Sequence, residues 1–330
     1  MPTFCRHNRL LQNCPICSRE RAIEMRPVIS SSAPRSADGR REASADAPAR
    51  RATTGRGGSR GAGLTVRRLV RGADDGYRCS LVPGLKSSED AERLAAELGF
   101  AATRIRRLVQ APPGLYAEIA GGGDRDERTW LAFQIAYICP LDGPEPFAEI
   151  KAVRTTWASG ELPELAGVRS GPRTAHDPAR GGQTLEAYRA WVQRAGSQAS
   201  AFAGEPAWTP ERRFTRLFER LGLPGLHRGA RFELLVSLGR LGVYEMRAAS
   251  LGLGGANEVT LAAKRLLGIG DSLLLERRAR DLASAGGIPL EALDLGLHNW
   301  ESGERATVGL GEEREPDPDV LAGLRTALEL

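Results

Sequence analysis

Apolar side chains recur at every third or fourth position through most of the chain after residue 112. This spacing places them on one face of a helix, whereas strict alternation would indicate a strand. No run of 18 apolar residues occurs, so we expect no transmembrane helix. The segments with the helical pattern are residues 128–139, 146–158, 184–195, 209–222, 229–242, 258–270 and 272–287. The pattern therefore predicts a mainly α-helical protein.

Capping residues mark the ends of several predicted helices. Asp124 and Glu127 stand at the start of a helix that Pro140 ends. Thr209 is placed as an N-cap, with Pro210 in the first turn. These residues give the apolar segments defined boundaries, which supports their interpretation as helices.

The region before residue 112 has a mixed pattern. Two segments of strand-like composition, residues 64–71 and 77–82, flank an Asp-Gly turn and predict a β-hairpin. Ser87 with Asp90 then forms an acidic variant of the capping box, and we expect the helix that follows to end at Gly99. Together these elements predict a small N-terminal α+β unit.

Residues 159–182 form a long irregular segment rich in Arg, Gly and Pro. Long loops within a compact domain are uncommon and are often functional. The predicted organisation is a zinc knuckle at 1–26, a disordered basic linker at 27–62, the α+β unit at 63–111, a helical domain at 112–301 and an acidic C-terminal tail at 302–330.

The net charge of +5 conceals an asymmetry. Residues 1–72 carry 15 Arg and 5 acidic residues, whereas the rest carries 31 basic and 36 acidic residues. A basic arm before a mildly acidic body is typical of proteins that contact nucleic acid. Compositional bias of the gene is an alternative explanation, because all but three of the 46 basic residues are Arg. The N-terminus lacks the apolar stretch of a secretory signal, so we expect a cytoplasmic protein.

Three of the five cysteines lie close to the N-terminus. Cys5, His7, Cys14 and Cys17 follow the pattern C-x-H-x6-C-x2-C, which supplies four ligands suited to a structural Zn²⁺ ion. Metal binding would provide the folding energy that so short a segment cannot obtain from a core. The alternative is four unliganded side chains on a disordered tail.

Gly268, Ile269 and Gly270 join two of the predicted helices. Glycines bring backbone amides to the surface, and amides at a helix start bind phosphate well. Arg277 and Arg278 follow one to two turns later and would extend such a contact with DNA. A plain turn between two helices, capped by glycine, is the alternative.

This part of the chain resembles the helix-hairpin-helix DNA glycosylase superfamily, over about residues 112–301. Members carry an L-P-G-[VI]-G hairpin that binds the DNA backbone and a downstream aspartate that faces the sugar of a flipped-out nucleotide. Gly268 to Gly270 match the hairpin, with Leu267 in place of the usual proline, and Asp294 matches the downstream aspartate. Residues 288–300, "IPLEALDLGLHNW", look closer to a divergent branch of the alpha-glutamyl/putrescinyl thymine pyrophosphorylase type.

The resemblance implies a fold, a partner and a reaction. It implies a glycosylase-like helical domain, double-stranded DNA with a flipped base as substrate, and a role in DNA repair or phage defence. Lysine-dependent members carry their lysine two residues after the hairpin, where this chain has Ser272, so the resemblance implies no Schiff base and no strand-nicking step.

The chemistry of such a reaction also points to Asp294. Breaking an N-glycosidic bond builds positive charge on the sugar, which a carboxylate stabilises. We expect Asp294 to lie in an open cleft, with capping of the helix towards Trp300 as the alternative. The candidate residues of the base pocket are Gln134, Trp157, Trp300 and Asn299. Core packing of the two tryptophans and a backbone contact of Gln134 are the alternatives.

The sequence thus favours a DNA-binding enzyme that cleaves or exchanges the N-glycosidic bond of a modified, thymine-type base. A non-catalytic DNA- or RNA-binding zinc protein is the rival hypothesis. Release of a base from modified DNA would separate the two.

Overall fold

A computed structural model describes residues 71–311 and 315–330. The described part is built from α-helices joined by loops and turns, and it contains no strand. The helices are α2 (Ser88–Gln110), α3 (Leu115–Ala120), α4 (Arg125–Ile138), α5 (Ala148–Val153), α6 (Gly181–Ala195), α7 (Gln198–Ala203), α8 (Pro210–Arg220), α9 (Arg228–Arg240), α10 (Glu258–Leu267), α11 (Ser272–Ala285), α12 (Leu290–Ser302) and α13 (Pro318–Ala327). The prediction of a mainly α-helical protein is confirmed for these residues.

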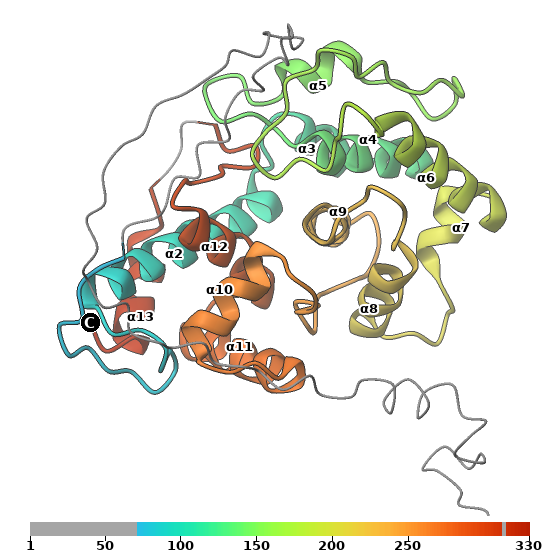
Figure 1. Cartoon of the computed structure of the whole chain (residues 1–330). Helices are drawn as coiled ribbons and strands as arrows, with labels where there is room; N and C mark the ends of the chain where they lie inside the picture. The colour runs from blue at the N-terminus through green and yellow to red at the C-terminus, as the bar shows by residue number, and fades with distance from the viewer. Residues whose placement is uncertain (1–70, 312–314) are drawn as a thin grey trace, which may run out of the picture. The chain divides into compact units, whose positions relative to one another are not determined.

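The helices form one continuous core in which α2 and α12 are neighbours (Figure 1). Helix α13 packs on α2, and α10 packs on α12. Helix α9 packs against α4, which also contacts α3 and α7. The packing of α10 on α12 therefore joins the element that carries the predicted hairpin to the element that carries the predicted aspartate.

Helix starts agree closely with the sequence. The Ser87 hydroxyl accepts a hydrogen bond from the amide of Asp90, and the Asp124 carboxylate accepts one from the amide of Glu127. Thr209 caps α8 in the same way. These short polar side chains satisfy amides that have no partner inside the helix.

The end predicted for the first helix is wrong. Helix α2 continues through Gly99 to Gln110. A Cβ atom on Gly99 would lie 3.1 Å from the Cβ of Pro316 and 3.6 Å from a methyl of Leu324. The glycine therefore provides close approach for the end of the chain instead of ending the helix.

The predicted β-hairpin is wrong for the part that the structure describes, because residues 77–82 contain no strand. The other predicted strand lies outside the described residues. The Tyr77 hydroxyl donates to the carbonyl of Leu328, and the amide of Gly84 donates to the carbonyl of Leu266 at 2.8 Å. Contacts to distant helices thus hold this segment, and the pattern of its neighbouring residues could not reveal them.

The predicted boundaries at 112 and 302 do not separate compact units, since Thr65–Leu330 forms one. Residues of the expected acidic tail form α13, in which Leu324 is fully buried, as is Leu328 just after it. Cys79 and Cys139 are buried free thiols. Among the described residues, no helix combines the length and apolarity needed to cross a membrane. The predicted zinc knuckle and basic linker lie outside the described residues.

Candidate functional site: a charged cavity beside Asp294

Asp294 lies in the middle of α12, which is unusually enclosed. All ten residues at 291–300 are buried, because α2 and α10 pack against this helix. A Cβ atom on Gly296 would lie 2.6 Å from a methyl of Leu98, so the glycine allows α2 and α12 to approach closely. Polar groups on such a helix must find partners within the protein.

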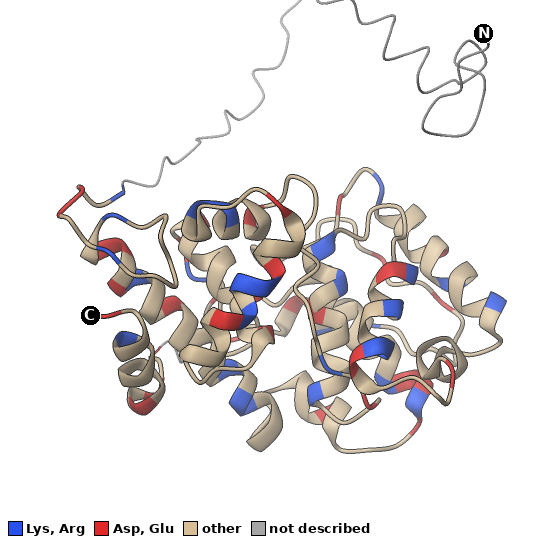
Figure 2. Ribbon diagram, turned by 90° about the horizontal axis from the view of Figure 1, so that it is seen from below, with Lys and Arg blue, Asp and Glu red and all other residues tan. Residues whose placement is uncertain are grey.

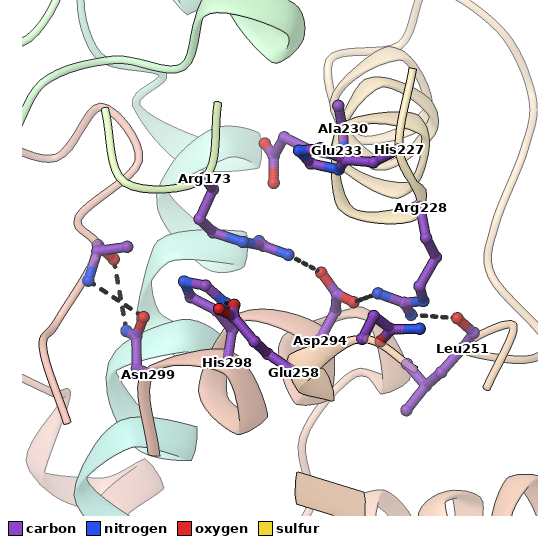
Figure 3. Close-up of polar contacts among 12 residues, drawn as sticks. Arg173, His227, Arg228, Ala230, Glu233, Leu251, Glu258, Asp294, His298 and Asn299 are labelled. Carbon is purple, nitrogen blue, oxygen red and sulfur yellow. Dashed lines mark hydrogen bonds and ion pairs between the residues drawn. The ribbon is translucent and has the colours of Figure 1, made fainter. Parts of the chain in front are cut away.

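Two arginines neutralise the Asp294 carboxylate. Arg173 donates from Nη2 to Oδ2 at 2.5 Å, and Arg228 donates from Nη1 to Oδ1 (Figure 3). Arg228 also donates from Nη2 to the carbonyl of Leu251. Asp294 is 2% exposed, so it does not lie in the open cleft that the sequence led us to expect. It is also not the cap of α12, because Pro289 occupies that position.

These contacts fix the charge state of the cluster. Burial alone would raise the pKa of Asp294, but the charges of Arg228 and Arg173 outweigh it and lower the pKa to about 2. The same pairing raises the pKa of Arg173, although burial opposes the change. Asp294 is therefore ionised at neutral pH and holds both guanidinium groups in place.

A cavity of about 420 Å³ is lined by both arginines. Its volume is within the usual range of small-molecule sites. Asp294 itself does not line it. The lining residues are Pro172, Arg173, Thr174, His227, Arg228, Gly229, Ala256, Asn257, Glu258, Val259, Leu261 and His298.

The N-termini of two helices reach this cavity. His227 caps α9 by accepting the amide of Ala230 at Nδ1, and Nε2 lies 2.7 Å from the carbonyl of Thr174. Asn257 caps α10. The first amides of a helix carry partial positive charge, so both ends favour an anion in the cavity.

Arg173 retains donors for a ligand. Its one hydrogen bond within the described residues uses Nη2, and Nε and Nη1 are not sealed off. In contrast, the Nε of Arg228 is buried without a partner in that part of the chain. Arg173 is thus the guanidinium group that is best placed to bind a ligand in the cavity.

A carboxylate–imidazole pair lies on the same cavity. The Nδ1 atom of His298 is 2.7 Å from Oε2 of Glu258. His298 is 8% exposed, and it lies near Arg173 in the close-up (Figure 3). The hydrogen bond from His298 lowers the pKa of Glu258 more than burial raises it. Glu258 therefore carries a negative charge that orients the imidazole ring.

The Gly-Ile-Gly turn is at the other end of α10. Gly268 ends this helix in the left-handed conformation, with φ of 66°, and Ile269 is half-buried. The Asp271 carboxylate then caps α11 by accepting the amides of Leu273 and Leu274, both at 3.0 Å. A phosphate at this helix start would compete with the Asp271 carboxylate for those amides.

Arg277 and Arg278 are exposed on α11. Arg278 donates weakly to the carbonyl of Ser80 at 3.4 Å, and no contact within the described part involves Arg277. Basic and acidic residues are interspersed over the described helices (Figure 2). Contact of these arginines with DNA therefore stays a prediction.

The four residues predicted for a base pocket do not come together at the cavity. Gln134 forms two 3.0 Å hydrogen bonds with the backbone of Thr155, the alternative that the sequence left open. Trp157 packs on Trp130, with ring centroids 5.6 Å apart. None of the four lines the cavity at Arg173.

Trp300 and Asn299, the other two residues predicted for the base pocket, hold α12 against its neighbours. Trp300 is fully buried and donates to the carbonyl of Asp90 at 3.0 Å. Asn299 exchanges hydrogen bonds with the backbone of Ala306. These contacts are structural, and a role of either side chain in reading a base stays a prediction.

From the sequence we did not identify Arg173, Arg228 or Glu258 as site residues, and His298 was only a weaker candidate. Two signals were present: Arg173 belongs to the long loop that was expected to be functional, and His298 is one of only four histidines. The pairing of Arg173 with Asp294, 121 residues apart, has no local signal.

Within residues 71–311 and 315–330, no three His, Cys, Asp or Glu side chains are grouped so that they could hold a metal ion. Comparisons of the chain with protein-family models, with curated proteins and with solved structures found no match.

Proposed function

We propose that this protein acts on DNA and cleaves or exchanges the N-glycosidic bond of a modified, thymine-type base, and that the cavity at Arg173 is its active site. The observation that carries the proposal is the position of α10. Its first turn lines the cavity, and its C-terminal end forms the Gly-Ile-Gly turn. A ten-residue helix is about 15 Å long, so α10 holds the cavity and the Gly-Ile-Gly turn at a fixed separation. This length corresponds to roughly four nucleotide steps along a DNA duplex.

The charges around the cavity suit a nucleotide. A flipped nucleotide brings its phosphate with it, and the open Nε and Nη1 donors of Arg173 supply a partner for that anion. The N-termini of α9 and α10 add partial positive charge at the same place. Leu261 and Val259 give the cavity an apolar side on which a base could pack.

Asp294 contributes to this reaction through its charge and through the arginines. Its carboxylate pairs with both guanidinium groups and keeps them in position. Asp294 does not line the cavity, so direct contact with a sugar would require the cluster to rearrange. The catalytic role assigned to Asp294 therefore includes positioning, and an uncharged substitute should impair both functions.

The arm before residue 71 belongs to the same proposal. We expect Cys5, His7, Cys14 and Cys17 to hold one structural zinc ion and the basic linker to contact phosphates. Metal analysis of the purified, reduced protein tests the first point, with one equivalent of zinc expected. A content below half an equivalent would contradict it.

A base-release assay tests the function. Duplex oligonucleotides that carry different thymine and cytosine modifications are incubated with excess protein, with and without pyrophosphate, and free base is detected by mass spectrometry. Release from at least one thymine-type substrate supports the proposal. Binding of DNA without release from any substrate would contradict it and favour a non-catalytic binding protein.

A further inference from the structure

We infer that His298, oriented by Glu258, is the group that accepts a proton during the reaction in the cavity. The inference rests on the proposed function and assigns the proton transfer to a residue other than Asp294. It concerns a pair of side chains from two helices, α10 and α12, which α11 separates in the sequence.

The geometry fixes which nitrogen of His298 carries the proton. An ionised carboxylate only accepts hydrogen bonds, so Nδ1, at 2.7 Å from Glu258, must be the N–H donor. In the neutral ring Nε2 then holds the lone pair. This is the tautomer that His298 requires to act as a general base towards the cavity.

The Nε2 atom is accessible to a ligand. No hydrogen bond within the described residues uses it, and it is not one of the buried polar atoms that lack a partner there. His298 lines the cavity, so the accessible atom lies on its wall. A water molecule between Nε2 and a bound sugar would meet the distance requirement for general base catalysis.

The surrounding positive charges keep Glu258 ionised. Arg173 and His227, like His298, lie close enough to Glu258 to favour its ionised form. Asp294 and Arg228 complete the charged groups around the cavity, and they are already paired. Glu258 is thus the carboxylate that is free to stabilise an imidazolium ion at His298.

Asp294 is poorly suited to accept this proton. Both of its oxygens receive hydrogen bonds from guanidinium groups, and it does not reach the cavity. Its pKa of about 2 also makes it a weak base. His298, in contrast, lines the cavity and has a ring nitrogen that forms no hydrogen bond within the described residues.

The step balances with water as the attacking group. Nε2 takes one proton from water while the water oxygen bonds to C1′ of the sugar. The C1′–N bond breaks, and its electron pair leaves with the base as an anion. The imidazolium then returns the proton to the departing base, so the products are a free base and a hydroxyl on the sugar.

His298→Asn tests the inference, because the Asn amide can still donate to Glu258 in place of Nδ1 while the accessible Nε2 is removed. We expect kcat for base release to fall on the order of 10² to 10⁴, with KM for DNA changed less than threefold. The kcat of Glu258→Gln should lie between that of His298→Asn and that of the wild type. The control is Glu186→Ala, which removes an exposed carboxylate on α6 that does not line the cavity. Its kcat and KM should equal those of the wild type.

Nitrogen NMR of histidine-labelled protein gives a readout that does not need activity. His298, assigned by its absence from the His298→Asn spectrum, should show the Nδ1–H tautomer, and Glu258→Ala should abolish that preference. A wild type with the proton on Nε2, or full activity of His298→Asn, would overturn the inference while the proposed function stands. A wild type that releases no base from any DNA would overturn the proposed function and this inference together.

Discussion

Two buried ion-pair clusters share helix α9, and they differ in what they leave free. In the first, Glu233 pairs with Arg104, which is 1% exposed. In the second, Arg228 and Arg173 pair with Asp294. Both clusters lie in the core, and Arg228 and Glu233 are little more than one helical turn apart.

In the Arg104 cluster every nitrogen of the guanidinium group is used. Nε donates to the carbonyl of Val308 at 3.0 Å, and Nη1 and Nη2 both donate to Glu233. Nη2 also reaches the hydroxyl of Tyr116 at 3.2 Å. A cluster that is satisfied in this way fixes the packing of α2 on α9 and has nothing left to bind a ligand.

The Asp294 cluster borders a 420 Å³ cavity and leaves two nitrogens of Arg173 accessible. Burying charge is costly, and a buried pair often stabilises no more than an apolar substitute. A buried cluster with spare donors on a cavity is therefore better explained by binding than by stability. We therefore expect substitutions in the Asp294 cluster to affect activity, and substitutions in the Arg104 cluster to affect mainly stability.

The largest effect is expected for Asp294→Asn. The variant keeps the size of the side chain but leaves two buried guanidinium groups without a countercharge. Single-turnover base release should fall on the order of 10² to 10⁴ after correction for the folded fraction, and stability should fall by about 3 to 5 kcal/mol. Kinetics and thermal melting on one preparation measure both. A fully active variant would remove Asp294 from the mechanism.

Glu233→Gln should separate the clusters. Arg104 would lose its countercharge, so the free energy of unfolding should fall by about 3 to 5 kcal/mol. Base release per folded molecule should change far less than in Asp294→Asn, because Glu233 does not line the cavity and acts on Arg173 only through its charge. Urea unfolding and single-turnover kinetics test this, with Glu186→Ala as the control within about 0.5 kcal/mol. Loss of activity in the folded fraction would show that the sealed cluster also serves the reaction.

Acid should destabilise the wild type through Asp294. Its pKa is lowered from 3.8 to about 2, so its contribution to stability is present above the unfolded pKa and is lost as pH falls through about 2. The change amounts to roughly 2 kcal/mol between pH 4 and pH 2. Asp294→Asn should lack this component when the two proteins are compared by urea unfolding. Parallel pH curves for both proteins would contradict the assignment.

Arg173→Met should weaken DNA binding. The substitution removes the donors that face the cavity, and we expect the Kd for DNA with an extrahelical modified base to rise about 10- to 100-fold. Arg104→Met, which removes a sealed guanidinium group, is the matched control and should leave the Kd of the folded protein unchanged. Equal effects of the two variants would show that the cavity is not where DNA binds.

The smallest effect concerns the basic arm, which belongs to neither cluster. Deletion of residues 1–62 should flatten the salt dependence of DNA affinity by about 0.9 in logarithmic slope for each phosphate that the arm neutralises in the full chain. Base release should persist, because the cavity residues remain. An unchanged slope would show that the arm neutralises no phosphate.

Local signals in the sequence predicted much of the helical architecture. The spacing of apolar residues located helices such as α9 and α10, and short polar residues such as Ser87 and Thr209 marked their starts. These features are local, because periodicity and capping involve residues within a few positions of each other. Gly99 was misjudged because its role depends on Pro316, which is near the other end of the chain.

The site could be predicted only in part, for the same reason. Asp294 was identified as a candidate, but its burial depends on Arg173 and Arg228, which no local pattern connects to it. Glu258 stands in the first turn of α10, and its partner His298 lies two helices later. Both contacts join charged residues that are far apart in the sequence, and hydrophobic periodicity does not predict such pairs.

Photo-crosslinking tests most directly whether the cavity at Arg173 receives the flipped base. A duplex with a single 4-thiothymine is irradiated in complex with the protein, and the crosslinked peptides are identified by mass spectrometry. We expect crosslinks to residues that line the cavity, within 172–174, 227–229 or 256–261, or at His298. Crosslinks confined to the region of Trp157 and Gln134, or to surface arginines alone, would contradict it.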